Sequence, residues 1–166
     1  MLVKAVINAS PLIFLSKLER LCLLNELFET IYIPDAVLDE INAETNAETN
    51  AIKQPGINNL DFKQLTVTNR TAVTGLLGRL HIGEVETIIG AIEHGFTTVI
   101  LDDNAARNKA KQFGLSVTGT LGVLLKASKR GLVSNLDQDI SKLIKAGLYV
   151  SDEIIKRILN KDINPL

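Results

Sequence analysis

The stretch TTVILDDNAARNKAKQFGLSVTGTLGVLLKASKRG (residues 97–131) decides the fold. It begins with a β-branched apolar run, which is typical of a buried strand. Two acids follow at the end of this run. Residues 104–114 then predict a helix closed by Gly114, and residues 115–120 predict a short strand. Residues 121–131 predict a second helix, which ends at Gly131. Strands that alternate with helices in this way indicate a parallel sheet flanked by helices.

The same alternation extends toward both ends of the chain. Further strands are predicted at residues 2–8, 30–34 and 65–68. A helix with Ser10 as its N-cap and Pro11 in its first turn breaks near Arg20. The other predicted helices begin at 34–35, cover 81–95, and close the chain at about 134–146 and 151–161. We therefore predict an α/β fold with a central, mainly parallel sheet, in which ligands bind outside the carboxyl ends of the strands.

The length and composition favour one domain over residues 1–166, with an aliphatic core. The chain is 46% hydrophobic and only 4% aromatic, and its mean hydropathy is +0.18. The tandem NAETNAETNA segment predicts a flexible low-complexity insertion at about 42–59. No apolar run reaches the roughly 20 residues that span a bilayer. Cys22, the single cysteine, is interpreted as a small core residue, and its isolation favours a reducing, cytoplasmic location.

The charges are segregated along the chain. Residues 1–103 carry 7 basic and 14 acidic side chains, whereas residues 104–166 carry 11 basic and 5 acidic ones. No acid occurs between 104 and 136, where six bases gather. This pattern is compatible with an acidic pocket beside a basic surface that holds phosphates, or with two solvated helix faces of opposite sign.

The acids fall where a parallel sheet brings side chains together. Asn8 follows the first strand, and Asp102 and Asp103 close the strand at 97–103. Glu40 and Glu84 lie on helices that start near the same edge. Convergent carboxylates are the ligands that Mg²⁺ and Mn²⁺ prefer, and such ions assist phosphodiester hydrolysis. The alternative is that these acids only stabilise turns and helix N-termini.

The sequence resembles the PIN-domain family of metal-dependent ribonucleases, which includes VapC-type toxins of toxin–antitoxin pairs. The resemblance rests on five stretches in the family's order: NASPLIFLSKLERLCLLNELF, IYIPDAVLDEI, LHIGEVETIIGAI, VILDDNAARNKAKQFGLSVTGTLGVLLKASKRGL and SDEIIKRIL. It implies a three-layer α/β/α fold, an acidic pocket with Mg²⁺ or Mn²⁺, RNA hydrolysis, a small antitoxin partner and homodimerisation.

Carried over residue by residue, the resemblance implies one catalytic and metal-binding set. Its members are Asn8, Glu40, Glu84 and the pair Asp102 and Asp103, between which the sequence does not choose. The hydroxyl after the first position falls on Ser10. The family pattern has aspartate where this chain has Asn8, so the pocket loses a carboxylate and both metal affinity and water activation should fall.

Other candidate residues concern the substrate. Arg107 lies one helical turn after the acidic pair and is predicted to grip a phosphate, or else to be a surface charge. Thr118 and Thr120 resemble the family's loop before a helix and either contact phosphate or cap that helix. The basic segment 104–130, with Lys126, is predicted to position RNA through its phosphates.

Three functions compete on these residues. The first is a PIN-type endoribonuclease toxin whose activity is weakened by Asn8, or silenced if the asparagine was introduced. The second is a degenerate PIN domain that binds RNA or an antitoxin without cutting. The third is a nucleotide-binding α/β domain, which the absence of GxGxxG and GxxxxGK[ST] disfavours.

Overall fold

A computed structural model describes residues 2–46 and 60–159 of the chain. The strands in these ranges form one parallel sheet in the order β3-β2-β1-β4-β5. Their bounds are β1 Lys4–Ile7, β2 Thr30–Pro34, β3 Phe62–Leu65, β4 Thr98–Ile100 and β5 Ser116–Thr118. The strand order reverses direction between β1 and β4. This reversal is the topological switch point, outside which open α/β sheets bind ligands.

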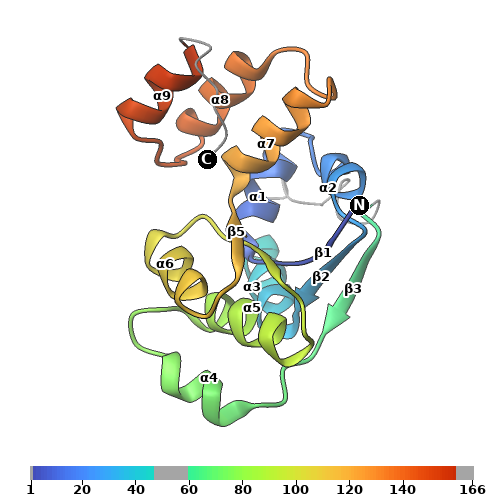
Figure 1. Ribbon diagram of the computed structural model, residues 1–166, viewed down its shortest axis with the longest axis vertical. Coiled ribbons are helices and arrows are strands. Elements are labelled where there is room, and N and C mark those ends of the chain that lie inside the picture. Colours follow the sequence, from blue (N-terminus) through green and yellow to red (C-terminus); the bar gives the residue numbers. More distant parts are fainter. Residues whose placement is uncertain (1, 47–59, 160–166) are drawn as a thin grey trace.

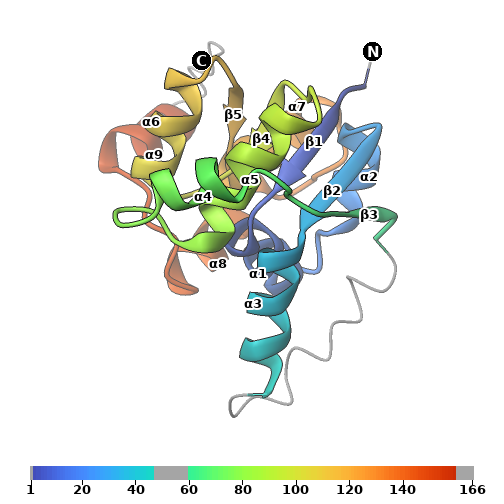
Figure 2. The same cartoon turned by 90° about the horizontal axis from the view of Figure 1, so that it is seen from below.

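Helices cover both faces of the sheet, as Figure 1 shows. One layer contains α1 (Ala9–Lys17), α2 (Cys22–Leu27), α7 (Thr120–Lys129) and α8 (Leu136–Lys145). The other contains α4 (Arg70–Leu76), α5 (Ile82–Glu93) and α6 (Asn104–Gln112). Helix α3 (Asp35–Asn46) packs against α1 and α5 and extends away from the sheet, and α9 (Asp152–Leu159) follows α8 (Figure 2). The predicted three-layer α/β/α fold is confirmed.

The alternation of side chains along the strands explains the two layers. Ile7 and Ile100 are fully buried in the core on the α1 side, whereas Val6, Val99 and Leu101 are buried in the core on the α5 side. Strands buried on both faces read as continuous apolar runs, which is why the strands at 2–8 and 97–103 were recognisable in the sequence. None of the described helices is long and apolar enough to cross a membrane.

Several local predictions need correction. Helix α1 begins at Ala9 with Asn8 at its N-cap position, so Ser10 is not the cap. Cys22 is exposed at the start of α2 rather than buried. Strand β3 lies three residues before the predicted 65–68, because Leu65 pairs with Pro34 as the last residue of the strand.

The end of α3 and the whole of α4 are helical where no helix was predicted from the sequence. Helix α3 continues to Asn46, so the first residues of the predicted insertion at 42–59 are helical. Residues 47–59, which hold the rest of that prediction, lie outside the described residues. Helix α4 was not predicted from the sequence; its N-cap Asn69 accepts a hydrogen bond from the backbone N–H of Ala72.

Candidate active site

A pocket of about 590 Å³ opens at the carboxyl edge of the sheet, outside β1 and β4. Polar side chains that follow these two strands, or begin the helices beside them, form one wall. The residues of this acidic wall are Asn8, Ser10, Glu84, Asp102, Asp103 and Asn104. Of the polar residues predicted to meet at this edge, Asn8, Ser10, Glu84, Asp102 and Asp103 line the pocket, whereas Glu40 does not.

Asn8 lies at the point where β1 becomes α1. Its backbone N–H donates to the carbonyl of Ile100 in β4 at 3.1 Å, which fixes it at the switch point. The side chain is only 5% exposed, yet its Oδ1 has no hydrogen-bond partner, and among the described residues no other buried side-chain oxygen or nitrogen is left so. A buried acceptor without a donor costs about 1–3 kcal/mol, and this oxygen is available to a water, a metal ion or another ligand in the pocket.

Glu40 approaches the same oxygen from α3. A Cβ added to Gly83 would lie 2.9 Å from Oε2 of Glu40 and 3.2 Å from Oδ1 of Asn8. Both oxygens therefore lie against the backbone of Gly83, in the first turn of α5. A glycine at this position allows α3, α1 and α5 to bring their polar groups close together.

Glu84 projects from the first turn of α5, and its Oε2 accepts a hydrogen bond from the backbone N–H of His81 at 3.0 Å. Burial raises the pKa of the Glu84 carboxyl above its ordinary value. The His81 backbone bond opposes this shift, the Asp103 carboxylate adds to it, and the charge of His81 again lowers the pKa. Glu84 is therefore a buried acid held close to a second carboxylate.

Replacing Glu84 with glutamine is expected to stabilise the protein at neutral pH. The folded state holds the Glu84 proton more tightly than the unfolded state, so its contribution to the free energy of unfolding falls as pH rises from the ordinary pKa through the raised one. Glutamine keeps an oxygen for the His81 N–H and carries no charge. Urea unfolding at pH 7 should show Glu84→Gln as the more stable protein, with the gap closing by pH 4.

The exposed Glu26→Gln variant is the matched control for this comparison and should change the free energy of unfolding little at either pH. A Glu84→Gln protein that is less stable than the parent at pH 7 would contradict the account of this buried charge.

The two adjacent aspartates have different surroundings. Asp102 accepts three hydrogen bonds: from the Ser10 hydroxyl at 3.1 Å, the Thr120 N–H at 2.7 Å and the Thr120 hydroxyl at 2.6 Å. Asp103 is exposed and caps α6, where its Oδ1 accepts from the Ala106 N–H at 2.8 Å. Asp102 thus joins β4 to α1 and α7, while Asp103 keeps one carboxylate oxygen clear of the capping bond.

The predicted substrate residues are only partly gathered at the pocket. The guanidinium of Arg107 donates to the carbonyl of Leu101 at 2.9 Å and does not line the pocket. Thr118 is buried, and both donors of Thr120 are directed to Asp102. Lys126 lies in the other layer, with Nζ 5.8 Å from the ring centroid of Phe28. The basic segment 104–130 is therefore divided between α6 and α7, on opposite faces of the sheet.

The donors at the pocket suit a hard divalent cation. Carboxylate and amide oxygens are the ligands of Mg²⁺ and Mn²⁺, and the partnerless Oδ1 of Asn8 lies beside Glu40 and in the pocket of Glu84 and Asp103. In the part of the chain that the structure describes, no three His, Cys, Asp or Glu side chains are grouped closely enough to hold a metal. A metal ion at this pocket would therefore need ligands other than these side chains, such as the Asn8 amide oxygen and water.

A comparison with protein families identifies the chain. A family model described as a PIN domain matches residues 4–163. The chain belongs to the PIN-domain family. No curated protein matches it. The family is one of nuclease folds, which agrees with an acidic pocket at the carboxyl edge of a parallel sheet.

An apolar part of this PIN-domain pocket was not predicted from the sequence. Phe14 of α1 and a segment from the end of α8 into α9 also line the pocket. This apolar wall consists of Phe14, Leu148, Tyr149 and Ile154, with Gly147 and Ser151 beside it. The only available signal was the resemblance of the C-terminal stretch SDEIIKRIL to the family, which placed no side chain at the site.

Proposed function

We propose that this PIN domain is a metal-dependent endoribonuclease whose activity is reduced by Asn8. The observation that carries the proposal is the buried, partnerless Oδ1 of Asn8, in the same pocket as Glu84 and Asp103. A folded protein bears the cost of such an atom most readily where a ligand satisfies it. The pocket also lies at the switch point of the sheet, where α/β folds bind their ligands.

The side chains have separable roles in this proposal. Glu84, Asp103, Glu40 and the Asn8 amide would hold Mg²⁺ or Mn²⁺. Such an ion would supply charge neutralisation for a phosphodiester and lower the pKa of an attacking water. Asp102 positions the pocket by tying Ser10 of α1 and Thr120 of α7 to the end of β4. We assign Lys109 and Lys111, in the last turn of α6, to longer-range attraction of the RNA backbone.

The biological setting belongs to the same proposal. A toxin role with a small antitoxin, homodimerisation and a cytoplasmic location are carried over from the family resemblance and the single cysteine. A second function, RNA or antitoxin binding without cleavage, is favoured by one specific observation. Asn8 brings no negative charge to a pocket that otherwise contains carboxylates.

Cleavage of an unstructured, end-labelled RNA tests the proposal. The protein should cut the RNA with Mn²⁺ or Mg²⁺ and stop when EDTA removes the metal. Glu84→Gln should lower the rate by about 10- to 100-fold or more, because even outer-shell changes at metal sites have effects of that size. Glu26→Gln, an exposed change away from the pocket, should cut at the parent's rate. Cleavage that is unaffected by EDTA and by Glu84→Gln would contradict the proposal.

A further inference from the structure

The pocket has two chemically different walls, and only the acidic wall is used in the proposed hydrolysis. The apolar wall joins Phe14, from the second turn of α1, to a segment more than 130 residues later in the sequence. Leu148 and Tyr149 lie in the connection between α8 and α9, and Ile154 lies in the first turn of α9. The fold thus brings its C-terminal helices to the mouth of the acidic site.

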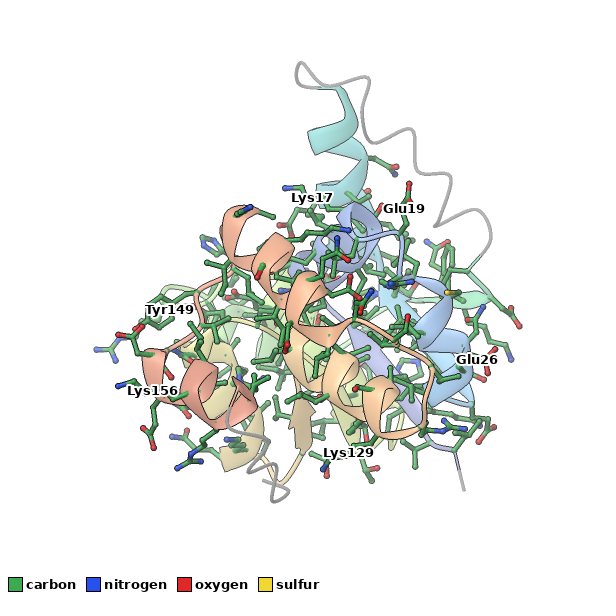
Figure 3. All side chains as sticks on the ribbon, turned by 90° about the horizontal axis from the view of Figure 1, so that it is seen from above. Lys17, Glu19, Glu26, Lys129, Tyr149 and Lys156 are labelled. Atoms are coloured by element: carbon green, nitrogen blue, oxygen red, sulfur yellow. The ribbon has the colours of Figure 1, made fainter. Side chains whose placement is uncertain are left out.

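Tyr149 is the most exposed large hydrophobic side chain in the described ranges, with 83% of its surface accessible. It projects at the edge of the molecule from the α8–α9 connection, as Figure 3 shows. An aromatic ring has a large apolar area that folding normally removes from water. Most of the Tyr149 side chain is not packed against other residues, although Tyr149 lines the pocket. Its ring is therefore available for a flat ligand.

The acidic wall indicates which flat ligand fits. A phosphodiester bound at Asn8, Glu84 and Asp103 would bring its own ribose and base into the pocket that Tyr149 also lines. The pocket, at about 590 Å³, has room for more than a metal ion and a phosphate. Unpaired bases stack on exposed aromatic rings and on apolar side chains, whereas the bases of a duplex are already stacked on one another. Lys156, on the same edge of the molecule in Figure 3, adds a positive charge that attracts the backbone.

We propose that Tyr149 and the apolar wall form a stacking site for an unpaired base of single-stranded RNA. The base is the one next to the phosphate at the acidic wall. The inference rests on the proposed ribonuclease function and adds a base-binding residue to it, because a base that stacks on Tyr149 has to leave any duplex. It also assigns the α8–α9 connection a direct role in substrate binding.

The absence of tryptophan from the sequence makes a direct test possible. Tyr149→Trp introduces a single tryptophan at the pocket, and Phe113→Trp introduces one after α6, at the end of that helix opposite its cap Asp103. Both proteins are titrated in Mg²⁺ with a short unpaired oligoribonucleotide, at a temperature and within a time for which gel analysis shows that the slow cleavage has left the RNA intact. The Tyr149→Trp emission should be quenched to saturation, while Phe113→Trp should show no saturable change.

Two further ligands separate stacking from simple proximity. An RNA duplex of the same length and an abasic ribose-phosphate oligomer should leave the Tyr149→Trp emission nearly unchanged. In fluorescence anisotropy with a labelled oligoribonucleotide, Tyr149→Ala should weaken binding about tenfold, and Tyr149→Phe should bind as the parent does. Tyr149 is too exposed for its truncation to unfold the chain.

The outcomes distinguish this inference from the ribonuclease proposal. Saturable quenching by unpaired RNA in a protein that cuts no RNA supports the stacking site and contradicts the nuclease. Metal-dependent cleavage that is the same in parent and Tyr149→Ala, with equal RNA binding, overturns the stacking site alone. Equal quenching by duplex and abasic oligomer also overturns it. So does a protein that binds no RNA but binds a peptide partner at Tyr149.

Discussion

Replacing Asp102 with alanine is expected to abolish RNA cleavage and to lower the free energy of unfolding by about 2–4 kcal/mol. The carboxylate accepts three hydrogen bonds, two of them from Thr120, which has no exposed surface. Without Asp102 the N–H and hydroxyl of Thr120 lose their acceptors, and each buried donor left unpaired costs about 1–3 kcal/mol. Relief of repulsion with neighbouring acids offsets part of that cost. Urea unfolding and a cleavage assay measure the two effects.

Asp103→Asn is the matched control for the Asp102 variant. Asparagine is as good an N-cap as aspartate, so the bond to the Ala106 N–H is kept and stability should change little. Cleavage should nevertheless fall by about 10- to 100-fold, because a carboxylate that faces the pocket is lost. If Asp102→Ala were as stable and as active as the parent, its assigned role in joining β4 to α1 and α7 would be wrong.

Replacing Asn8 with aspartate is expected to tighten Mn²⁺ binding about tenfold or more. The variant turns a neutral, partnerless oxygen into a charged one beside Glu40 and in the pocket of Glu84. Ligand charge is a principal determinant of affinity at sites for hard cations. Without metal the added carboxylate repels its neighbours, so the melting temperature should fall below that of the parent. Added Mn²⁺ should then raise it by more than it raises the parent's.

Asn104→Asp provides the control for charge alone. Asn104 is exposed and lines the same pocket at the first position of α6, so the variant adds an equal charge away from the Oδ1 of Asn8. Its Mn²⁺ affinity, measured by electron paramagnetic resonance of free Mn²⁺, should rise much less than that of Asn8→Asp. Equal gains in the two variants would show that general acidity, rather than the position of Asn8, determines binding.

Local sequence patterns were enough to predict the strands, the parallel sheet and the edge at which the pocket lies. Strands β1 and β4 are recognisable because both faces of the sheet are covered, which makes their sequences continuously apolar. Once the alternation with helices is seen, a parallel sheet follows, and so does the placement of Asn8 and Asp102 at one edge. The gathering of Glu84 and Asp103 in one pocket needed no information beyond that topology and the family resemblance.

Features that depend on contacts across the fold were not readable. Serine is a residue type typical of N-caps, but the hydroxyl of Ser10 donates its hydrogen bond to Asp102, 92 positions away in the sequence. Lys126 belongs to the same basic run as Arg107, yet β5 separates their helices and the sheet separates the layers. Tyr149 lines the pocket from the connection after α8, a helix that packs on α7. No spacing in the sequence encodes that approach.

A single comparison tests the central claim most directly: cleavage of one single-stranded RNA in Mn²⁺ by the parent protein and by Asn8→Asp, purified in parallel. The account predicts slow, EDTA-sensitive cleavage by the parent and cleavage at least about tenfold faster by Asn8→Asp. Inactivity of both proteins, with Mn²⁺ present and both folded, would contradict a ribonuclease site at this pocket.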